Sequence, residues 1–241
     1  MTRRTFGGLI GGAAVSSMGQ AAPAPRCYRM QTFYLRQGTQ LARLHEYLSS
    51  SLPNQTPALV LEAIVAAHLP QVVLILPNGT LEQAVFTPRG EAVAKWESGE
   101  EAPYEHYSLS ILEPTAYSPL LEFPEKRPEK PRIFELRTYH SPTWRQLAAL
   151  HERFAGPEIK IFHRVGVHPI LYTQTIAGGN MPNLTYVIPF ESLAAREKAW
   201  DAFAADPEWI KVRKESIERS GQIASINQIS LFRPASYSPI R

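Results

Sequence analysis

Several features that would point to a specific chemistry are missing from the sequence. Cys27 is the single cysteine, which excludes an internal disulfide framework and a metal site built from cysteines. No apolar run approaches the roughly 20 residues that a membrane-spanning helix needs. The sequence also lacks a glycine-rich phosphate loop and a Gly-x-Ser-x-Gly nucleophile turn. We therefore expect no membrane span, no metal site and no cofactor, and the sequence indicates no particular reaction.

The charge of the chain is nearly balanced. It has 25 Lys and Arg residues against 22 Asp and Glu residues, a formal net charge of +3. Two of the positive charges, Arg3 and Arg4, lie in an N-terminal segment that we expect to be removed. A near-neutral protein lacks the electrostatic footprint of nucleic-acid binding, so we expect no nucleic acid partner. With 44% apolar residues in 241, the chain can bury one large core or two small ones.

The first residues have the pattern of an export signal. Arg3 and Arg4, followed at one residue's distance by Phe6, resemble the twin-arginine signal, and a short, mildly apolar stretch follows. Small residues before and at Ala21 predict cleavage after that residue. We therefore expect residues 1–21 to be removed and the protein to be periplasmic or secreted. The alternative is an ordinary arginine-rich N-terminus.

Four segments of the sequence occur twice in the same order. The matching pairs are 28–33 (YRMQTF) with 134–139 (FELRTY), 40–46 (QLARLHE) with 146–152 (QLAALHE), 57–70 with 169–182, and 114–119 (PTAYSP) with 234–239 (PASYSP). The order of the four matches predicts an internal duplication.

Each copy has the pattern of a ferredoxin-like βαββαβ domain. In the second copy, alternation over residues 133–139 predicts a strand, and Ser192 and Asp206 are typical residues for starting helices. One face of such a sheet remains uncovered by helices and needs a partner. We therefore predict an α+β fold in which two tandem ferredoxin-like domains pack their antiparallel sheets into an intramolecular α/β barrel.

The predicted domain boundaries follow the duplication. They are an export signal at 1–21, a degenerate first copy at 27–121, a linker rich in proline and charge at 122–132, and a second copy at 133–241. The first copy is called degenerate because prolines, glycines and glutamates occupy residues 87–103, where the second copy has a helix. We expect a short helix around residues 90–97 there, followed by a loop.

The second copy carries a combination of motifs that is found together in one family. They are the strand at 134–139, the SLAARE block at 192–197 and the Asp206-Pro207-Glu208-Trp209 block, which the first copy lacks. On these residues the second copy resembles the NIPSNAP family of dimeric α/β-barrel proteins, in particular its exported bacterial branch. The resemblance implies the fold, but no chemistry that transfers residue by residue. Cofactor-free monooxygenases and haem enzymes occur in the wider superfamily, which is an analogy of fold alone.

The first strand of the second copy offers the main candidates for a site. Glu135, Arg137 and Tyr139 alternate with apolar residues and share one face. If the apolar set packs under the helices, this polar set points into the barrel and lines a pocket for a small anionic or aromatic molecule. A structural ion pair between the sheets is the alternative. The full candidate set is Glu135, Arg137, Tyr139, His151, Tyr172 and Trp144.

Histidines offer a second kind of candidate. His45 and His151 occupy matching positions on the first predicted helix of each copy. Each is either a general base or, more simply, a hydrogen-bonded core histidine. His163 and His168 have no further ligand nearby in the sequence, so we do not expect them to bind a metal.

Two hypotheses of function remain open. The first is an exported α/β-barrel protein that binds a small ligand or another protein. The second is a cofactor-free monooxygenase-like or haem-binding enzyme that acts on a small aromatic or anionic substrate. The duplication can complete the barrel within one chain, so both a monomer and a homodimer are compatible with the sequence.

Overall fold

The computed structural model describes residues 25–52, 58–85, 90–122, 124 and 129–241. The expected export signal at 1–21 lies outside the described residues, and so does part of the expected linker at 122–132. None of the helices in these ranges is both long and apolar enough to cross a membrane.

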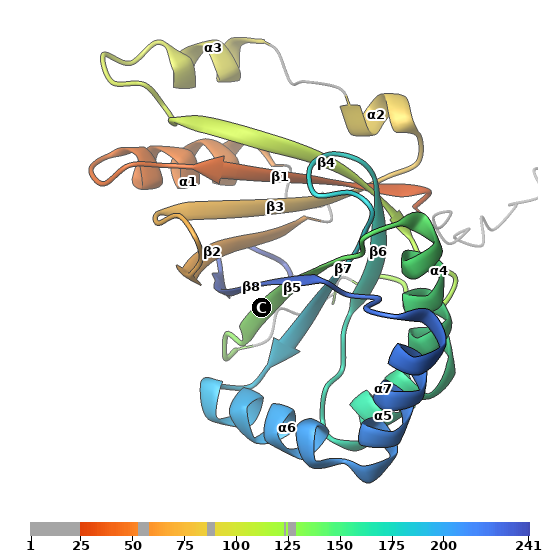
Figure 1. Cartoon of the computed structure of the whole chain (residues 1–241). Coiled ribbons are helices and arrows are strands. Elements are labelled where there is room, and N and C mark those ends of the chain that lie inside the picture. The colour runs from red at the N-terminus through yellow and green to blue at the C-terminus, as the bar shows by residue number, and fades with distance from the viewer. Residues whose placement is uncertain (1–24, 53–57, 86–89, 123, 125–128) are drawn as a thin grey trace, which may run out of the picture.

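The chain folds into two halves that share one order of strands and helices (Figure 1). The first half contains β1 (Cys27–Tyr34), α1 (Gln40–Ser51), β2 (Leu59–Val65), β3 (Gln71–Asn78), α2 (Leu81–Val85), α3 (Glu91–Glu97) and β4 (His106–Pro114). The second half contains β5 (Ile133–His140), α4 (Trp144–Arg153), the π-helical turn η1 (Phe154–Glu158), α5 (Ile159–Arg164), β6 (Leu171–Ala177), β7 (Asn183–Phe190), α6 (Leu193–Ala205), α7 (Pro207–Ser220) and β8 (Ile226–Pro234). The predicted short helix of the first copy is confirmed as α3.

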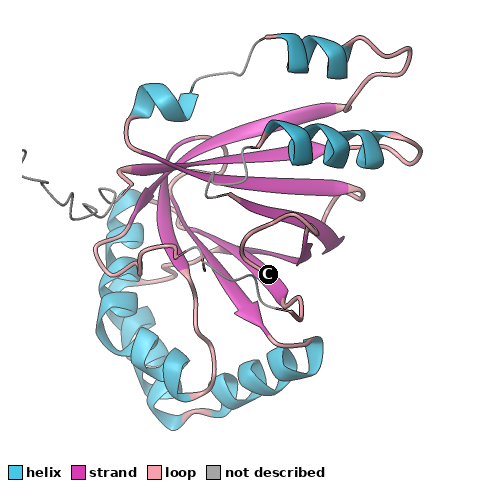
Figure 2. Ribbon diagram, turned by 180° about the vertical axis from the view of Figure 1, so that it is seen from behind, coloured by secondary structure: helices cyan, strands magenta, loops and turns pink. Residues whose placement is uncertain are grey.

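The strands form one closed antiparallel barrel in the order β1-β3-β2-β8-β5-β7-β6-β4. Each half supplies a sheet of ferredoxin-like order, β4-β1-β3-β2 and β8-β5-β7-β6. The halves join where β2 pairs with β8 and β4 pairs with β6. Figure 2 shows the helices of the two halves on opposite sides of the strands. The predicted α+β fold with an intramolecular α/β barrel is therefore confirmed.

Two helix starts follow directly from local hydrogen bonding. The Ser192 side chain accepts a hydrogen bond from the backbone N–H of Ala195 at the start of α6. Asp206 caps α7 by accepting from Glu208 and Trp209, with Pro207 at the first position, where no donor is needed. Both predicted caps are confirmed.

The apolar side chains form a core between the two sheets and a separate core under the helices of each half. The inter-sheet core contains Tyr28 and Phe134 from equivalent positions of β1 and β5. The next residues on the same strands, Arg29 and Glu135, therefore point the other way, toward the helices. Both faces of β1 and β5 are buried, so polar residues on either face lie within the protein rather than at its surface.

The repeated PTAYSP and PASYSP segments, 114–119 and 234–239, are closing tails that bind the opposite half. The Tyr117 hydroxyl lies 2.7 Å from Nδ1 of His151, and the Tyr237 hydroxyl lies 2.8 Å from Nδ1 of His45. Burial lowers the pKa of His151, so its neutral ring can accept a hydrogen bond from the Tyr117 hydroxyl. The two matching histidines are thus partly buried residues that hydrogen-bond to the other copy.

Backbone contacts of the closing tails repeat in the same way. The Ser118 hydroxyl accepts from the N–H of Tyr172 at 2.9 Å, and the Ser238 hydroxyl accepts from the N–H of Val60 at 3.2 Å. Each tail therefore adds hydrogen bonds to the second strand of the opposite half.

Replacing Tyr117 or Tyr237 with Phe removes only the hydroxyl that reaches the opposite half. We expect Tyr117→Phe and Tyr237→Phe each to lower the free energy of unfolding by about 1 kcal/mol, the usual net value of a hydrogen bond. Urea denaturation measures the change. Tyr34→Phe is the matched control, because the Tyr34 hydroxyl makes only an exposed contact of 3.5 Å with Ser108. Equal stability of all three variants would contradict a stabilising role of the tails.

Candidate functional site

The polar face of β5 points out of the barrel, against α6. Oε2 of Glu135, which is fully buried, accepts hydrogen bonds from Nε of Arg196 at 2.5 Å and Nε1 of Trp200 at 3.1 Å. Its other oxygen pairs with Arg137, whose guanidinium lies 3.6 Å from the centre of the Trp200 ring. Arg137 also donates to the Tyr139 hydroxyl at 2.7 Å. This corrects the expectation that the polar set faces the barrel interior: it is an ion-pair network between sheet and helix.

The candidate residues of the second half are linked by a row of tyrosines. The ring centres are 5.3 Å apart for Tyr139 and Tyr186, 5.6 Å for Tyr186 and Tyr172, and 5.4 Å for Tyr172 and Tyr117. Tyr117 continues the row to His151. The structure thus brings five of the six candidates into one layer under the helices.

The remaining candidates lie outside this layer. Trp144, at the start of α4, is 57% exposed and apart from the other five. The rings of His163 and His168 stack 5.1 Å apart, and both residues are exposed. Across the described ranges, no three His, Cys, Asp or Glu side chains lie close enough together to hold a metal ion.

A second buried ion pair was missed by the sequence reasoning. Glu158, on the π-helical turn η1, accepts a hydrogen bond of 2.6 Å from Nε of Arg153. Burial raises the pKa of Glu158 to about 7, although Arg153 opposes the shift. Gly156 and Pro157 interrupt the regular helix here. In the sequence, this pair of helix-breaking residues was the available sign of an irregular turn.

The matching face of the first half holds a cavity of about 470 Å³ between β1, β3, α1 and α3. It exists because α2 and α3 have only 5 and 7 residues, whereas α6 and α7 have 13 and 14. In the second half, Trp200 and Phe203 of α6 pack on the sheet. At the equivalent position the described residues of the first half have only the short helices α2 and α3.

Aromatic side chains form the walls of this cavity. Its rings come from β1, α1, α3, the segment before β4 and β4 itself, and they are Phe33, Tyr47, Trp96, Tyr104 and Tyr107. Trp96 stacks on Tyr47 with ring centres 4.3 Å apart and meets Tyr104 at 5.3 Å. Nε1 of Trp96 is buried, and no hydrogen-bond acceptor for it occurs among the described residues. The walls therefore offer flat apolar surfaces and one N–H donor.

Arg29 lies at the floor of the cavity, on β1. It is 4% exposed and donates to Oε1 of Gln31 at 2.8 Å and to the carbonyl of Ala84 at 3.3 Å, both neutral acceptors. Burial lowers its pKa below the ordinary value, but an arginine starts so high that the guanidinium stays charged at neutral pH. The cavity thus combines a buried cation with aromatic walls, and Glu91 and Glu97 of α3 also line it.

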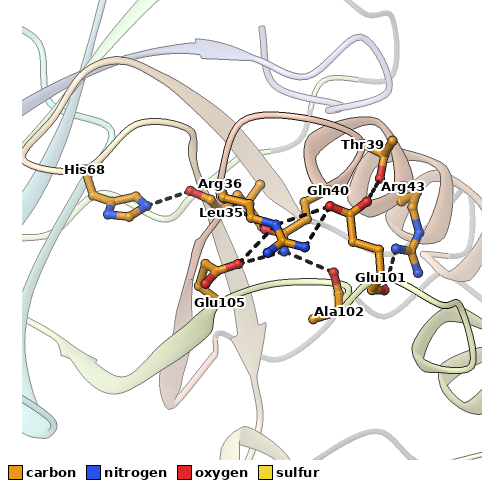
Figure 3. Close-up of polar contacts among 9 residues, drawn as sticks. All are labelled: Leu35, Arg36, Thr39, Gln40, Arg43, His68, Glu101, Ala102 and Glu105. Atoms are coloured by element: carbon orange, nitrogen blue, oxygen red, sulfur yellow. Dashed lines mark hydrogen bonds and ion pairs between the residues drawn. The ribbon is translucent and has the colours of Figure 1, made fainter.

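Hydrogen bonds from α1 fix the wall that carries Trp96, and Figure 3 shows those to Glu101 and Ala102, which follow α3. Arg43 donates to the carbonyl oxygens of Trp96 at 3.1 Å and Glu101 at 2.7 Å. Gln40, which is fully buried, donates to the carbonyl of Ala102 at 3.0 Å. The short helix α3 is held over the cavity by these bonds.

Comparison with known proteins identifies the second half. Residues 134–239 match the NIPSNAP family model. The C-terminal half of the chain is a NIPSNAP domain. The resemblance stated from the sequence is confirmed for that half, and the first half completes its barrel. No curated protein is similar enough to match the chain.

Solved structures share the fold of the NIPSNAP domain and its partner half. A monooxygenase-like protein from Fusobacterium nucleatum has a TM-score of 0.55 at 7% identity, covering 88% of this chain and 94% of its own. An anthrone oxidase-like protein has a TM-score of 0.51 at 13% identity, covering 87% and 91%. A NIPSNAP family protein of unknown function from Agrobacterium tumefaciens covers 48% of this chain and 98% of its own, with 19% identity and a TM-score of 0.42. At these identities, the likeness to the Fusobacterium protein and to the anthrone oxidase-like protein shows the fold alone.

Removing Glu135 from the NIPSNAP domain leaves the buried Arg137 without its carboxylate partner. We expect Glu135→Ala to lower the free energy of unfolding by about 3–5 kcal/mol, as for other broken buried ion pairs. The exposed Glu197 on α6 provides the control, and Glu197→Ala is expected to change stability by less than about 0.5 kcal/mol. Chemical denaturation of both variants tests this; similar values would show that the pair contributes little.

Proposed function

We propose that the protein binds a small aromatic anion in the cavity of its first half. The observation that carries this proposal is the buried Arg29 guanidinium beneath aromatic walls. The cavity volume of about 470 Å³ falls within the range of about 300–1,000 Å³ that small-molecule sites occupy.

Each part of such a ligand has a matching group in the cavity. A carboxylate can lie beside the buried positive charge of the Arg29 guanidinium, which also donates to Gln31 and Ala84. An aromatic ring can pack against Trp96 and Tyr104, and a second acceptor on the ligand can take the Trp96 N–H. A neutral analogue forfeits this attraction between opposite charges.

The second half gives less support to a monooxygenase-like or haem-binding enzyme. The ionisable groups that suggested catalysis are engaged with one another: Glu135 pairs with Arg137 and Arg196. These paired side chains fix α6 to the sheet, and they are poorly placed to move a proton to a substrate. Ligand binding in the first half is the function that the geometry supports best.

Titration of the protein with benzoate and 2-naphthoate tests the proposal. We expect both to quench Trp96 fluorescence and to bind at least tenfold more tightly than benzamide and 2-naphthamide, which have the rings without the charge. Affinity is expected to fall below about pH 4, where a carboxylate becomes protonated. Calorimetry gives the dissociation constants.

Variants locate the binding. Arg29→Gln and Trp96→Leu are each expected to weaken binding at least tenfold, whereas Trp144→Leu, which removes an exposed tryptophan of the second half, is expected to leave it unchanged. Thermal unfolding of each variant checks that it is folded. Equal binding of anions and amides, or unchanged binding in both cavity variants, would refute the proposal.

We also propose that the chain is exported by the twin-arginine route, on the basis of Arg3, Arg4 and Phe6. Replacing both arginines with lysine is expected to retain the full-length protein in the cytoplasm. The control is Arg26→Lys, which lies beyond the expected cleavage site. Cell fractionation followed by immunoblotting measures the distribution, and an unchanged exported fraction in the double variant would contradict the proposal.

A further inference from the structure

We infer that one end of the barrel interior is a second binding site, for a neutral polyhydroxy molecule of the size of a mono- or disaccharide. This site is separate from the cavity of the first half and lies between the two sheets. It is a cavity of about 470 Å³ lined by residues from both halves of the chain.

The barrel interior changes character along its length. One part is filled by the inter-sheet core around Tyr28 and Phe134. Farther along β1 and β5, the inward positions hold Thr32 and Thr138, which line the cavity. These two threonines are equivalent in the duplication, so the two halves supply matching walls.

The cavity is reached where the seams between the halves are incomplete. The pairing of β4 with β6 begins only at Ile111, and the pairing of β8 with β2 begins only at Leu231. The first residues of β4 and β8, including Ser108 and Gln228, precede these points and line the cavity. Both residues are exposed, which places them at its mouth.

The wall formed by β5, β6 and β7 is a connected row of hydroxyl and amide groups. The Thr138 and Thr185 hydroxyls lie 3.0 Å apart, and Oδ1 of Asn183 accepts from Thr185 at 3.2 Å and from Thr175 at 2.8 Å. The Asn183 amide nitrogen donates to the carbonyl of Asn180 at 2.9 Å. These bonds fix the orientation of Asn183 and leave the hydroxyl oxygens, each with two lone pairs, able to accept further bonds.

The chemistry of the lining selects among ligand classes. Most of the lining side chains are hydroxyls or amides, and none of those that line it in the described residues is charged. A charged ligand would lose its hydration without gaining a countercharge, and an apolar ligand would strip water from hydroxyls without replacing its hydrogen bonds. A neutral molecule with many hydroxyls avoids both costs, because it is donor and acceptor at once.

The first experiment measures binding of neutral sugars to the full chain. Glucose, maltose and trehalose are compared with glucuronate and glucosamine by saturation-transfer NMR, and Kd is determined by calorimetry. We expect at least one neutral sugar to bind, and its affinity to exceed that of both charged sugars at least fivefold. Failure of all three neutral sugars to bind, or equal binding of a charged sugar, overturns the inference.

Variants of the lining residues test whether the sugar binds in the cavity between the sheets. Gln228→Ala and Thr138→Val remove groups that line the cavity, and Ser230→Trp fills it; each is expected to weaken sugar binding at least fivefold. Asn227→Ala is the matched control, because Asn227 pairs with Tyr139, whose side chain faces the helices, and so lies on the opposite face of β8. Circular dichroism and retained benzoate binding show which variants are folded. Full sugar affinity in the folded cavity variants, or an equal loss in Asn227→Ala, overturns the assignment.

Discussion

The pairing of β2 with β8 and of β4 with β6 is the constraint on which the rest of the molecule depends. Around Tyr28 and Phe134 the inner face of each sheet is apolar, and in the described residues neither half has a helix to cover it, so the other half must do so. The closing tails make the dependence mutual, because each extends from the last strand of one half to the first helix of the other. The Tyr237–His45 bond joins residues 192 positions apart in the sequence. Burial of the inner faces, and with it the shape of the inter-sheet cavity, therefore requires both halves.

Residues at equivalent strand positions have different surroundings in the two halves. Glu135 of β5 is enclosed by α6, and its charge is balanced by Arg137 and Arg196. Its counterpart Arg29 of β1 lies under two short helices, beside neutral acceptors and aromatic rings. The difference arises from the length of the covering helices rather than from the sheets, which share the same order. One half is packed and the other retains space for a ligand.

The sequence predicted the architecture well because the evidence for it is repetitive. Four matched segments revealed the duplication, and the βαββαβ pattern then required the barrel. Local signals with a short range, such as the caps at Ser192 and Asp206, were also reliable. The segments 114–119 and 234–239 were recognised as repeats, but their contacts with His151 and His45 were not, because the partners lie in the opposite half.

The site was harder to predict, for two physical reasons. Alternation along β5 shows that Glu135 and Arg137 share a face, but both faces of this strand are buried, so the pattern does not show which face is inside the barrel. The first-half cavity gathers Phe33, Tyr47 and Trp96 from three separate elements. No spacing in the sequence brings them together. The shortness of α3 was interpreted only as degeneration of the first copy, and not as space for a ligand.

Joining the two halves in one polypeptide also has an evolutionary consequence. In a barrel built from two identical subunits, every substitution occurs twice, so a change that opens a cavity in one subunit opens it in the other and weakens both. Here a mutation affects one half only. The NIPSNAP domain can keep the ion pairs and aromatic packing that support the whole barrel, while its partner half accumulates changes that would be too costly in duplicate. Selection for stability and selection for recognition can thus act on different stretches of one gene.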